Sequence, residues 1–553
     1  MKVFIDFAVI PFITKGIALS DRESNGITRL GVLSMPYRMH AAPMAGFFGY
    51  DPVQDLPLDH LARFIEGAVE NSVHPRVKGQ GRGQREFDPR LLTKVLLYGY
   101  ATGIRSSRQL ERLCNESLPY LFLTRGDTPC YHTLSTFRVE QTKFIEQVWL
   151  DLFEIAGQVG LKRMGQITID SSKFRADASP DAVVKAGEYQ PVIAELKRML
   201  AESAAIDAAE DNQAPGRTRL ERTVGHDQMR DILRRVRKQR QPSSTVPDGQ
   251  AQSVPTGSAA ASDSAPCVIS PRMRKRIEAG IATIEAAEAE GRKHACLTDP
   301  DARMMGEGRE KHVREGHAFE VAVDNGLLVA GQSSNSAADN PRMAGLVEAA
   351  RKHEPDGLHA VDADSGYYSG AAVAALLAEG IDVCIPDSNT ACDLHRDQPI
   401  GTTLSRITGS VAFEYNSERD VYTCPEDNVL VFHQSRTERG QDFRIYRAAR
   451  SCEDCPLRSQ CGRKDLGKHR TLHILANKDI MDAHLARFSE DAHRERYARR
   501  GAAVETVFAF IRAVLGYRRW QLRGSERVEC EAQLFKTAYQ IRKIHHRFAA
   551  GAA

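Results

Sequence analysis

The sequence predicts an α/β domain preceded by an all-helical N-terminal domain. Between residues 59 and 138, apolar residues recur at helical spacing in short segments that carry capping residues and tight breaks. Between residues 317 and 386, β-prone runs alternate with turns and a helical segment. The first pattern indicates packed helices, and the second is typical of a sheet with connecting helices.

The N-terminal helices are predicted from their caps. Asp88 can cap the longest helix, in "DPRLLTKVLLYGYATG", and a second amphipathic helix follows with Ser106 or Ser107 as its cap. A third helix begins at Thr133 or Ser135. This outline fits a helix-turn-helix DNA-binding unit, and it fits a small helical packing domain equally well.

Strands are predicted where β-prone runs meet turns. In "GQITIDSSKFRADAS" the run 167–169 leads into Asp170, which predicts a strand that ends in an acid. A charged helical insertion follows, with a Pro/Ser/Gly-rich linker at 241–266. The segment "HAFEVAVDNGLLVAGQSS" predicts a hairpin around its Asn-Gly turn. After it come a strand in "GLHAVDADSGYYSG", a helix in "AAVAALLAEG" and a strand in "IDVCIP".

Composition limits the class of protein. The chain has 553 residues, of which 42% are hydrophobic and 27% charged, so several globular domains are expected. The formal net charge of +3 conceals basic clusters at 217–240 and 512–527. These suit a polyanion partner, although charge runs are more often solvated faces. Eleven scattered cysteines do not suggest a disulfide scaffold, and no run approaches a membrane span, so a cytoplasmic protein is expected.

Three acids suggest phosphoryl-transfer chemistry. Asp170 and Asp364 each follow a predicted strand, and Asp362 competes with Asp364 for its role. Glu505 borders a helical apolar stripe, with Arg512 two turns later on nearly the same face. Two divalent ions need carboxylates that converge from adjacent elements. Taken singly, each aspartate reads more simply as a turn or cap residue, and the glutamate as part of an ordinary amphipathic helix.

The order Asp, Asp, Glu, with basic "GYRRWQLRG" after the glutamate, resembles the catalytic domain of DDE transposases of bacterial insertion sequences. The segments "FDPRLLTKVLLYGYATGIRSSRQLERLC" and "TPCYHTLSTFR" look like the DNA-end-binding region of one branch of this family. Similarly, "DPDARMM", "VAVDNG", "DADSGYYS" and "VETVFAFIRAVLGYRRWQLRG" look like its catalytic core. The resemblance implies an RNase H-like catalytic domain with inserted segments.

The resemblance also implies roles for single residues. Asp170, Asp364 and Glu505 would hold two Mg²⁺ or Mn²⁺ ions. The implied DNA contacts are Arg105, Arg108, Arg138, Tyr497, Arg500, Arg512, Arg518, Arg519 and Arg523. Two features depart from the family pattern. Arg500 lies five residues before Glu505 where four is usual, and Gly316, His317 and Ala318 replace the usual Gly-Tyr-Asn.

Four cysteines form a separate motif. Cys424, Cys452, Cys455 and Cys461 offer four thiolates, two of them in a C-x-x-C knuckle, so a structural Zn²⁺ is predicted. Reduced, buried cysteines are the alternative. In either case the motif lies between the second aspartate and the glutamate, where related transposases carry an insertion.

The expected organisation has six parts. It comprises an unassigned extension (1–50), a helical DNA-end-binding domain (51–145), a catalytic core (146–180 and 296–390), the charged insertion (181–295), a cysteine-containing insertion (391–480) and C-terminal helices with the glutamate (481–547).

The function implied by the resemblance is metal-dependent cleavage at insertion-sequence ends, followed by strand transfer into target DNA. The partners would be the terminal inverted repeats and target DNA, with a homodimer on paired ends and location at the nucleoid. A metal-dependent nuclease without strand transfer and an inactive DNA-binding derivative remain open.

Overall fold

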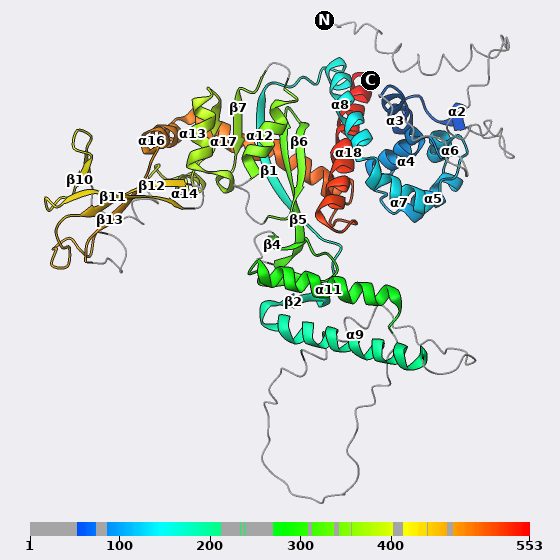
Figure 1. The fold of residues 1–553 in the computed structure, drawn as a ribbon. Coiled ribbons are helices and arrows are strands. Elements are labelled where there is room, and N and C mark those ends of the chain that lie inside the picture. Colours follow the sequence, from blue (N-terminus) through cyan, green and yellow to red (C-terminus); the bar gives the residue numbers. More distant parts are fainter. Residues whose placement is uncertain are drawn as a thin grey trace, which may run out of the picture. The chain divides into compact units, whose positions relative to one another are not determined.

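The computed structural model describes residues 52–72, 86–211, 233, 237, 269–307, 312–336, 342–354, 357–401, 413–438, 441–461 and 468–552. The predicted extension at 1–50, the linker at 241–266 and nearly all of the basic cluster at 217–240 lie outside these residues. A mixed α/β architecture with N-terminal helices is confirmed (Figure 1). The predicted domain bounds stay predictions.

The N-terminal region is helical, as predicted. Asp88 caps α4 by accepting a hydrogen bond from the Arg90 backbone N–H, and Ser106 caps α5. Two details differ from the prediction: α6 is an additional helix, and α7 begins at Tyr131 because Cys130 already has the extended backbone of a cap residue. The helices are α2 (Pro52–Asp55), α3 (Leu61–Glu70), α4 (Pro89–Ala101), α5 (Ser107–Glu116), α6 (Leu118–Thr124), α7 (Tyr131–Glu140) and α8 (Thr142–Gln158).

The main sheet has six strands. Its order is β4 (Arg303–Glu307), β5 (His312–Asp324), β1 (Gln166–Arg175), β7 (Ala360–Ala363) and β8 (Asp382–Cys384), and β6 (Leu327–Ser334) also pairs with β5. Strands β1, β7 and β8 run parallel. The predicted hairpin is β5–β6, and Asn325 and Gly326 at its turn both have positive φ, as a tight hairpin turn requires.

Several helices lie between or after the strands of this sheet in the sequence. They are α12 (Met343–Arg351), the short η5 (Ser365–Tyr367), α13 (Gly370–Ala378) and α14 (Ser388–His395). The predicted helix in "AAVAALLAEG" is therefore confirmed as α13, and β7 and β8 flank it as expected.

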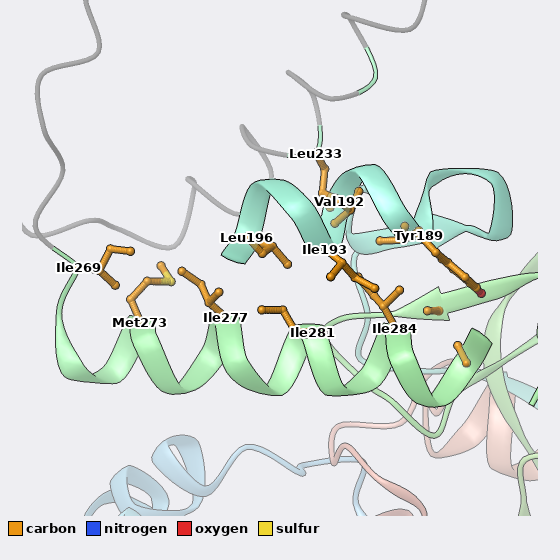
Figure 2. Close-up of a cluster of buried hydrophobic side chains, with 13 residues drawn as sticks. Tyr189, Val192, Ile193, Leu196, Leu233, Ile269, Met273, Ile277, Ile281 and Ile284 are labelled. Atoms are coloured by element: carbon orange, nitrogen blue, oxygen red, sulfur yellow. The ribbon is translucent and has the colours of Figure 1, made fainter. Parts of the chain in front are cut away.

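The chain divides into two compact units whose limits fall inside β1 and β5. The second unit comprises Lys173–His317 and Arg519–Val528, and the first contains the remainder. In the second unit, α9 (Tyr189–Asp211) packs on α11 (Pro271–Ala289), and Ile193, Leu196, Ile277 and Ile284 interleave between them (Figure 2). The same unit holds η2 (Pro180–Ala182), β2 (Val183–Lys185), η3 (Ala186–Glu188) and β3 (His294–Cys296), with β2 paired to β3.

A second, antiparallel sheet in the first unit has five strands. Its order is β13 (Thr471–Leu475), β12 (Gln441–Ala448), β11 (Val429–Glu438), β10 (Val421–Thr423) and β9 (Glu414–Asn416). The hairpin β11–β12 is its longest part. All four cysteines of the predicted metal motif lie at the ends of these strands or in the loop before β13.

The C-terminal helices are α16 (Lys478–Ala486), η6 (Arg487–Ser489), α17 (Asp491–Ala509), the π-helical turn η7 (Phe510–Val514) and α18 (Ser525–Ala552). Helix α18 lies beside α8 (Figure 1), and the Lys536 ammonium sits 3.7 Å from the centre of the Trp149 ring. On the sheet side, the Gln540 side chain accepts a hydrogen bond from the Leu328 backbone N–H. Among the described residues, no helix combines the length and apolar character needed to cross a lipid bilayer.

Candidate active site

Asp170 and Asp364 occupy matching positions on neighbouring parallel strands. The register of β1 and β7 pairs Ile169 with Ala363, and the two aspartates are the next residues of the two strands. Neighbouring strands lie roughly 4.8 Å apart, and residues at one register position project to the same face. The two half-buried residues therefore lie next to each other on the chain's neighbouring segments, at the point where β7 ends.

The strand that carries Asp170 does not end there, so that prediction is wrong. Pairing with β7 stops at Ile169, but β1 continues to Arg175 because its other neighbour in the sheet is β5. Asp170 thus sits in mid-strand, where the pairing partner is lost on one side. Its Oδ1 accepts a hydrogen bond from the Ser171 backbone N–H at 2.7 Å.

Asp364 begins the turn after β7. Its side chain caps η5 by accepting a hydrogen bond from the Gly366 backbone N–H at 2.9 Å. Asp362, the competing acid, is 3% exposed and is held by two partners. Arg496 donates to its Oδ1 and Gln166 donates to its Oδ2. Asp362 therefore has a structural ion pair, while Asp364 stands at the open end of the strand.

Two side-chain contacts hold helix α17 and the turn after it against these strands. Near its start, Arg496 pairs with Asp362 on β7 and with Asp382 on β8. Beyond its end, the Arg512 guanidinium donates to the Ser172 hydroxyl on β1 at 2.7 Å. Along the chain, Glu505 lies between these two contacts.

The predicted apolar stripe of this helix is confirmed. Val504, Val507, Phe508, Ile511 and Leu515 are all buried, and Glu505 is exposed beside them. Residues 510–514 form a π-helical turn, and Arg512 lies within it. The Arg512 guanidinium donates to Ser172 on β1, and its predicted alignment with Glu505 stays a prediction.

The glutamate side chain lies against a glycine. A Cβ placed at Gly501 would be 3.4 Å from Glu505 Oε1, so the carboxylate bends back along the helix toward that residue. Tyr497 and Arg500 lie on the preceding turns, with the guanidinium 4.8 Å from the tyrosine ring centre. Burial raises the pKa of Tyr497; Arg500 opposes this shift, and the negative charge of Asp364 adds to it. Tyr497 is therefore close to the second aspartate.

Arg496 and Ser172 are the site residues that the sequence analysis did not single out. Arg496 and Asp362 are 134 residues apart in the sequence, and Arg512 and Ser172 are 340 residues apart. Contacts between residues so far apart cannot be predicted from local sequence patterns. The only available signal was the concentration of arginines on one helical segment, which does not say which of them is used internally.

The N-terminal arginines have unequal exposure. Arg138 is 6% exposed and donates to the Tyr100 hydroxyl and the Arg105 backbone carbonyl, so its guanidinium has internal partners, and its contact with DNA stays a prediction. Arg105 is also largely buried and lies 4.4 Å from the Tyr517 ring centre, with Glu531 at 3.9 Å. Of the three, only Arg108 is exposed.

The segment "GYRRWQLRG" alternates buried aromatic residues with exposed arginines. In the first unit, Tyr517 is fully buried, donates to the Tyr100 carbonyl and stacks on Phe535. In the second unit, Trp520 is fully buried and donates to the His317 carbonyl. The predicted DNA contacts of this segment are all exposed: Arg518, Arg519 and Arg523.

His317, which departs from the family pattern, is a buried structural residue. It is 1% exposed, and its Nε2 lies 3.0 Å from Asp299 Oδ2. The other oxygen of Asp299 accepts from the Gly524 backbone N–H at 3.1 Å. Hydrogen bonding and the positive charge of His317 outweigh burial and lower the pKa of Asp299.

The four cysteines of the metal motif surround one cavity of about 220 Å³. Cys424, Cys452, Cys455 and Cys461 all line it, each of intermediate exposure and none in a disulfide. Across the described residues, however, no three His, Cys, Asp or Glu side chains are already close enough to enclose a metal ion. That holds for these thiols and for the three acids alike.

Comparison with known families bears on both ends of the chain. Residues 423–545 match the family described as "Transposase DDE domain". The matched range includes Glu505 and the four cysteines. Residues 49–140 match the family described as "Transposase domain (DUF772)", which covers helices α2 to α7. No curated protein matches the chain. Both matched families are transposase families, and together the two matches support an insertion-sequence transposase of the DDE type.

Proposed function

We propose that this chain is a DNA transposase that cleaves insertion-sequence ends and joins them to target DNA in metal-dependent reactions. The observation that carries the proposal is the register of β1 and β7, which sets Asp170 and Asp364 side by side. Glu505 completes the set from the helix that Arg496 and Arg512 fasten across the same strands. We further propose that the parallel strands β1, β7 and β8 form the centre of an RNase H-like fold.

The donor set suits hard divalent cations. Asp170, Asp364 and Glu505 offer only carboxylate oxygens, the ligands that Mg²⁺ and Mn²⁺ prefer. Because the described acids are not yet gathered around a common centre, the exposed Glu505 side chain has to turn from Gly501 toward the aspartates. When bound, two such ions would supply Lewis acidity to the attacking and leaving oxygens of the phosphodiester.

The remaining residues position DNA. Tyr497 and Arg500 lie on the helix face near Asp364, where they can contact phosphates next to the scissile bond. Arg518, Arg519 and Arg523 offer exposed guanidinium groups from one short segment, and Arg108 does so from the helical region. In this proposal the same carboxylates serve hydrolysis at the end and attack by the freed 3′-hydroxyl. Two chains would act on paired inverted repeats.

The test replaces one carboxylate while keeping its shape. Asp170→Asn should lower both end cleavage and strand transfer by more than about 100-fold. Loss of a residue that only supports a metal ligand costs up to about 100-fold, and loss of a direct ligand should cost more. Binding to a DNA fragment that carries the element's own end should stay unchanged. Asp181→Asn is the matched control, because Asp181 is an exposed acid outside the site. Full cleavage by Asp170→Asn with Mg²⁺ would refute the assignment.

The same assay separates the two alternatives. A nuclease without strand transfer would give hydrolysed ends and no joined products at any time point. An inactive DNA-binding derivative would bind the end fragment and give neither product. The intact acids at positions 170, 364 and 505 argue against the inactive derivative.

A further inference from the structure

The four-cysteine cavity lies at one end of the antiparallel sheet. Cys424 follows β10 directly and opens a tight turn, in which its carbonyl accepts from the Asp427 N–H and its own N–H donates to the Asn428 carbonyl. Asp427 holds φ at 51°, as such a turn needs. Cys452, Cys455 and Cys461 all belong to the loop between β12 and β13. Two separate segments thus bring their thiols to the same place.

The apolar core of this sheet is too small to hold it alone. Its buried residues are Tyr422, Leu430, Tyr446 and Ala448. On the opposite side of the sheet, Val429 and Val431 of β11 are 37% and 45% exposed. A lobe of this size ordinarily needs a disulfide or a structural metal to supplement such a core. Its cysteines form no disulfide, so a structural metal ion is the remaining way to stabilise it.

The cavity also carries the features of a thiolate site. The Asn428 side-chain amide points at Cys452 Sγ, with a donor–acceptor distance of 3.6 Å. Three arginines line the same cavity, namely Arg450, Arg458 and Arg470. Arg458 donates to the Cys452 carbonyl, while the buried Nε of Arg470 has no hydrogen-bond partner. Two acids, Glu426 and Asp454, line the cavity as well, so the three arginines leave an excess of positive charge. Four thiolates around one divalent ion carry a net charge of −2 and would offset that excess.

We propose that Cys424, Cys452, Cys455 and Cys461 bind one structural Zn²⁺ ion that closes the end of the β9–β13 sheet. Four thiolates in tetrahedral geometry are a standard structural zinc set, and binding releases the thiol protons to solvent. Because the thiols surround the cavity without meeting, the ion draws the 452–461 loop toward the Cys424 turn. This site is separate from the proposed carboxylate centre and concerns the stability of the lobe.

The first measurement is metal content. The full-length chain, purified without chelators, should contain about one zinc per chain by elemental analysis. Replacement by Co²⁺ should give the intense visible absorption of tetrahedral thiolate coordination. A chain that contains no zinc and takes up neither Zn²⁺ nor Co²⁺ would refute the proposal. Iron with a visible charge-transfer spectrum would also refute it, since that indicates an iron–sulfur cluster.

The second measurement assigns the ligands. Cys455→Ser and Cys461→Ser should each lose the zinc and melt at a lower temperature, whereas Cys392→Ser, an exposed cysteine on α14, should keep both properties. Should a variant fail to fold, titration of wild-type protein with a mercurial reagent still decides the question. Zinc should then be released in step with the modified thiols. Full zinc content in the Cys455→Ser/Cys461→Ser double variant would overturn the assignment.

Asp170→Asn separates this proposal from the transposase function. That variant should retain full zinc content whether or not it cleaves DNA. Loss of zinc in it would mean that the metal sits at the carboxylate centre, which contradicts the cysteine site.

Discussion

Asp362 and Asp364 are two residues apart in the chain, yet they have opposite surroundings. The first is buried between Arg496 and Gln166, and the second caps a turn at the surface of the strand end. A buried carboxylate with a fixed guanidinium serves stability, because separating such a pair leaves an uncompensated charge. A half-exposed carboxylate beside a second acid can take up a cation.

The two aspartates can be distinguished by one pair of variants. Asp362→Asn should lower the free energy of unfolding by roughly 1.5–3 kcal/mol, because Arg496 then loses its buried charge partner and keeps only Asp382. Asp364→Asn should leave thermal stability within about 0.5 kcal/mol and abolish cleavage of the end fragment. Chemical denaturation and the cleavage assay measure the two effects. The reverse pattern would make Asp362 the catalytic acid.

A second buried acid sets a pH dependence. Burial, assisted by the negative charge of Asp324, raises the pKa of Glu354 to about 7, whereas an unfolded glutamate titrates near ~4.3. The folded state therefore holds a proton that the unfolded state has lost. The resulting stabilisation is fully present below the unfolded pKa and disappears as the pH rises through about 7.

Glu354→Gln should remove this contribution. The wild-type chain should lose stability relative to Glu354→Gln between about pH 4.5 and pH 7. Urea denaturation across that range measures the difference. Glu348→Gln, an exposed acid on α12, should keep the wild-type slope. An unchanged slope in Glu354→Gln would mean that another group titrates there.

Among the elements, the end of α4 and the end of η7 meet at a glycine. Gly103 has φ of 82°, and a Cβ at this position would lie 2.9 Å from the Leu515 carbonyl oxygen. Leu515 directly follows the π-helical turn that carries Arg512. The helical region and the helix of Glu505 are therefore in backbone contact, with no room for a side chain.

Gly103→Ala tests this contact. The positive φ alone should cost about 1–2 kcal/mol, and displacement of Leu515 should add to it. Gly160→Ala is a matched control, because Gly160 has φ of 78° with nothing within 4 Å of its Cβ. Equal losses of unfolding free energy in the two variants would show that the Leu515 contact contributes nothing.

Across the whole molecule, local sequence patterns predicted helix caps and the hairpin but missed side-chain partners that lie far apart in the sequence. Asp88, Ser106 and the Asn325-Gly326 turn act within a few residues, so the caps and the hairpin were predictable. The internal roles of Arg138 and Arg496 depend on residues 38 and 134 positions away, and no periodicity reports them. The π-helical turn at 510–514 was not predictable either, because one extra residue in a turn leaves the hydrophobic pattern nearly unchanged.

The contact of Tyr517 with Tyr100 also determines when the N-terminal helices can complete their folding during synthesis. These residues are 417 positions apart, and the fully buried Phe535 packs on both of their rings. Domains ordinarily fold one after another as they leave the ribosome, at roughly 5–20 residues per second. Here the N-terminal helices cannot complete their core until residue 535 has been made, roughly 20–90 seconds after residue 100. A nascent chain thus waits with the core of its N-terminal helices unfinished until the C-terminal helix has been made.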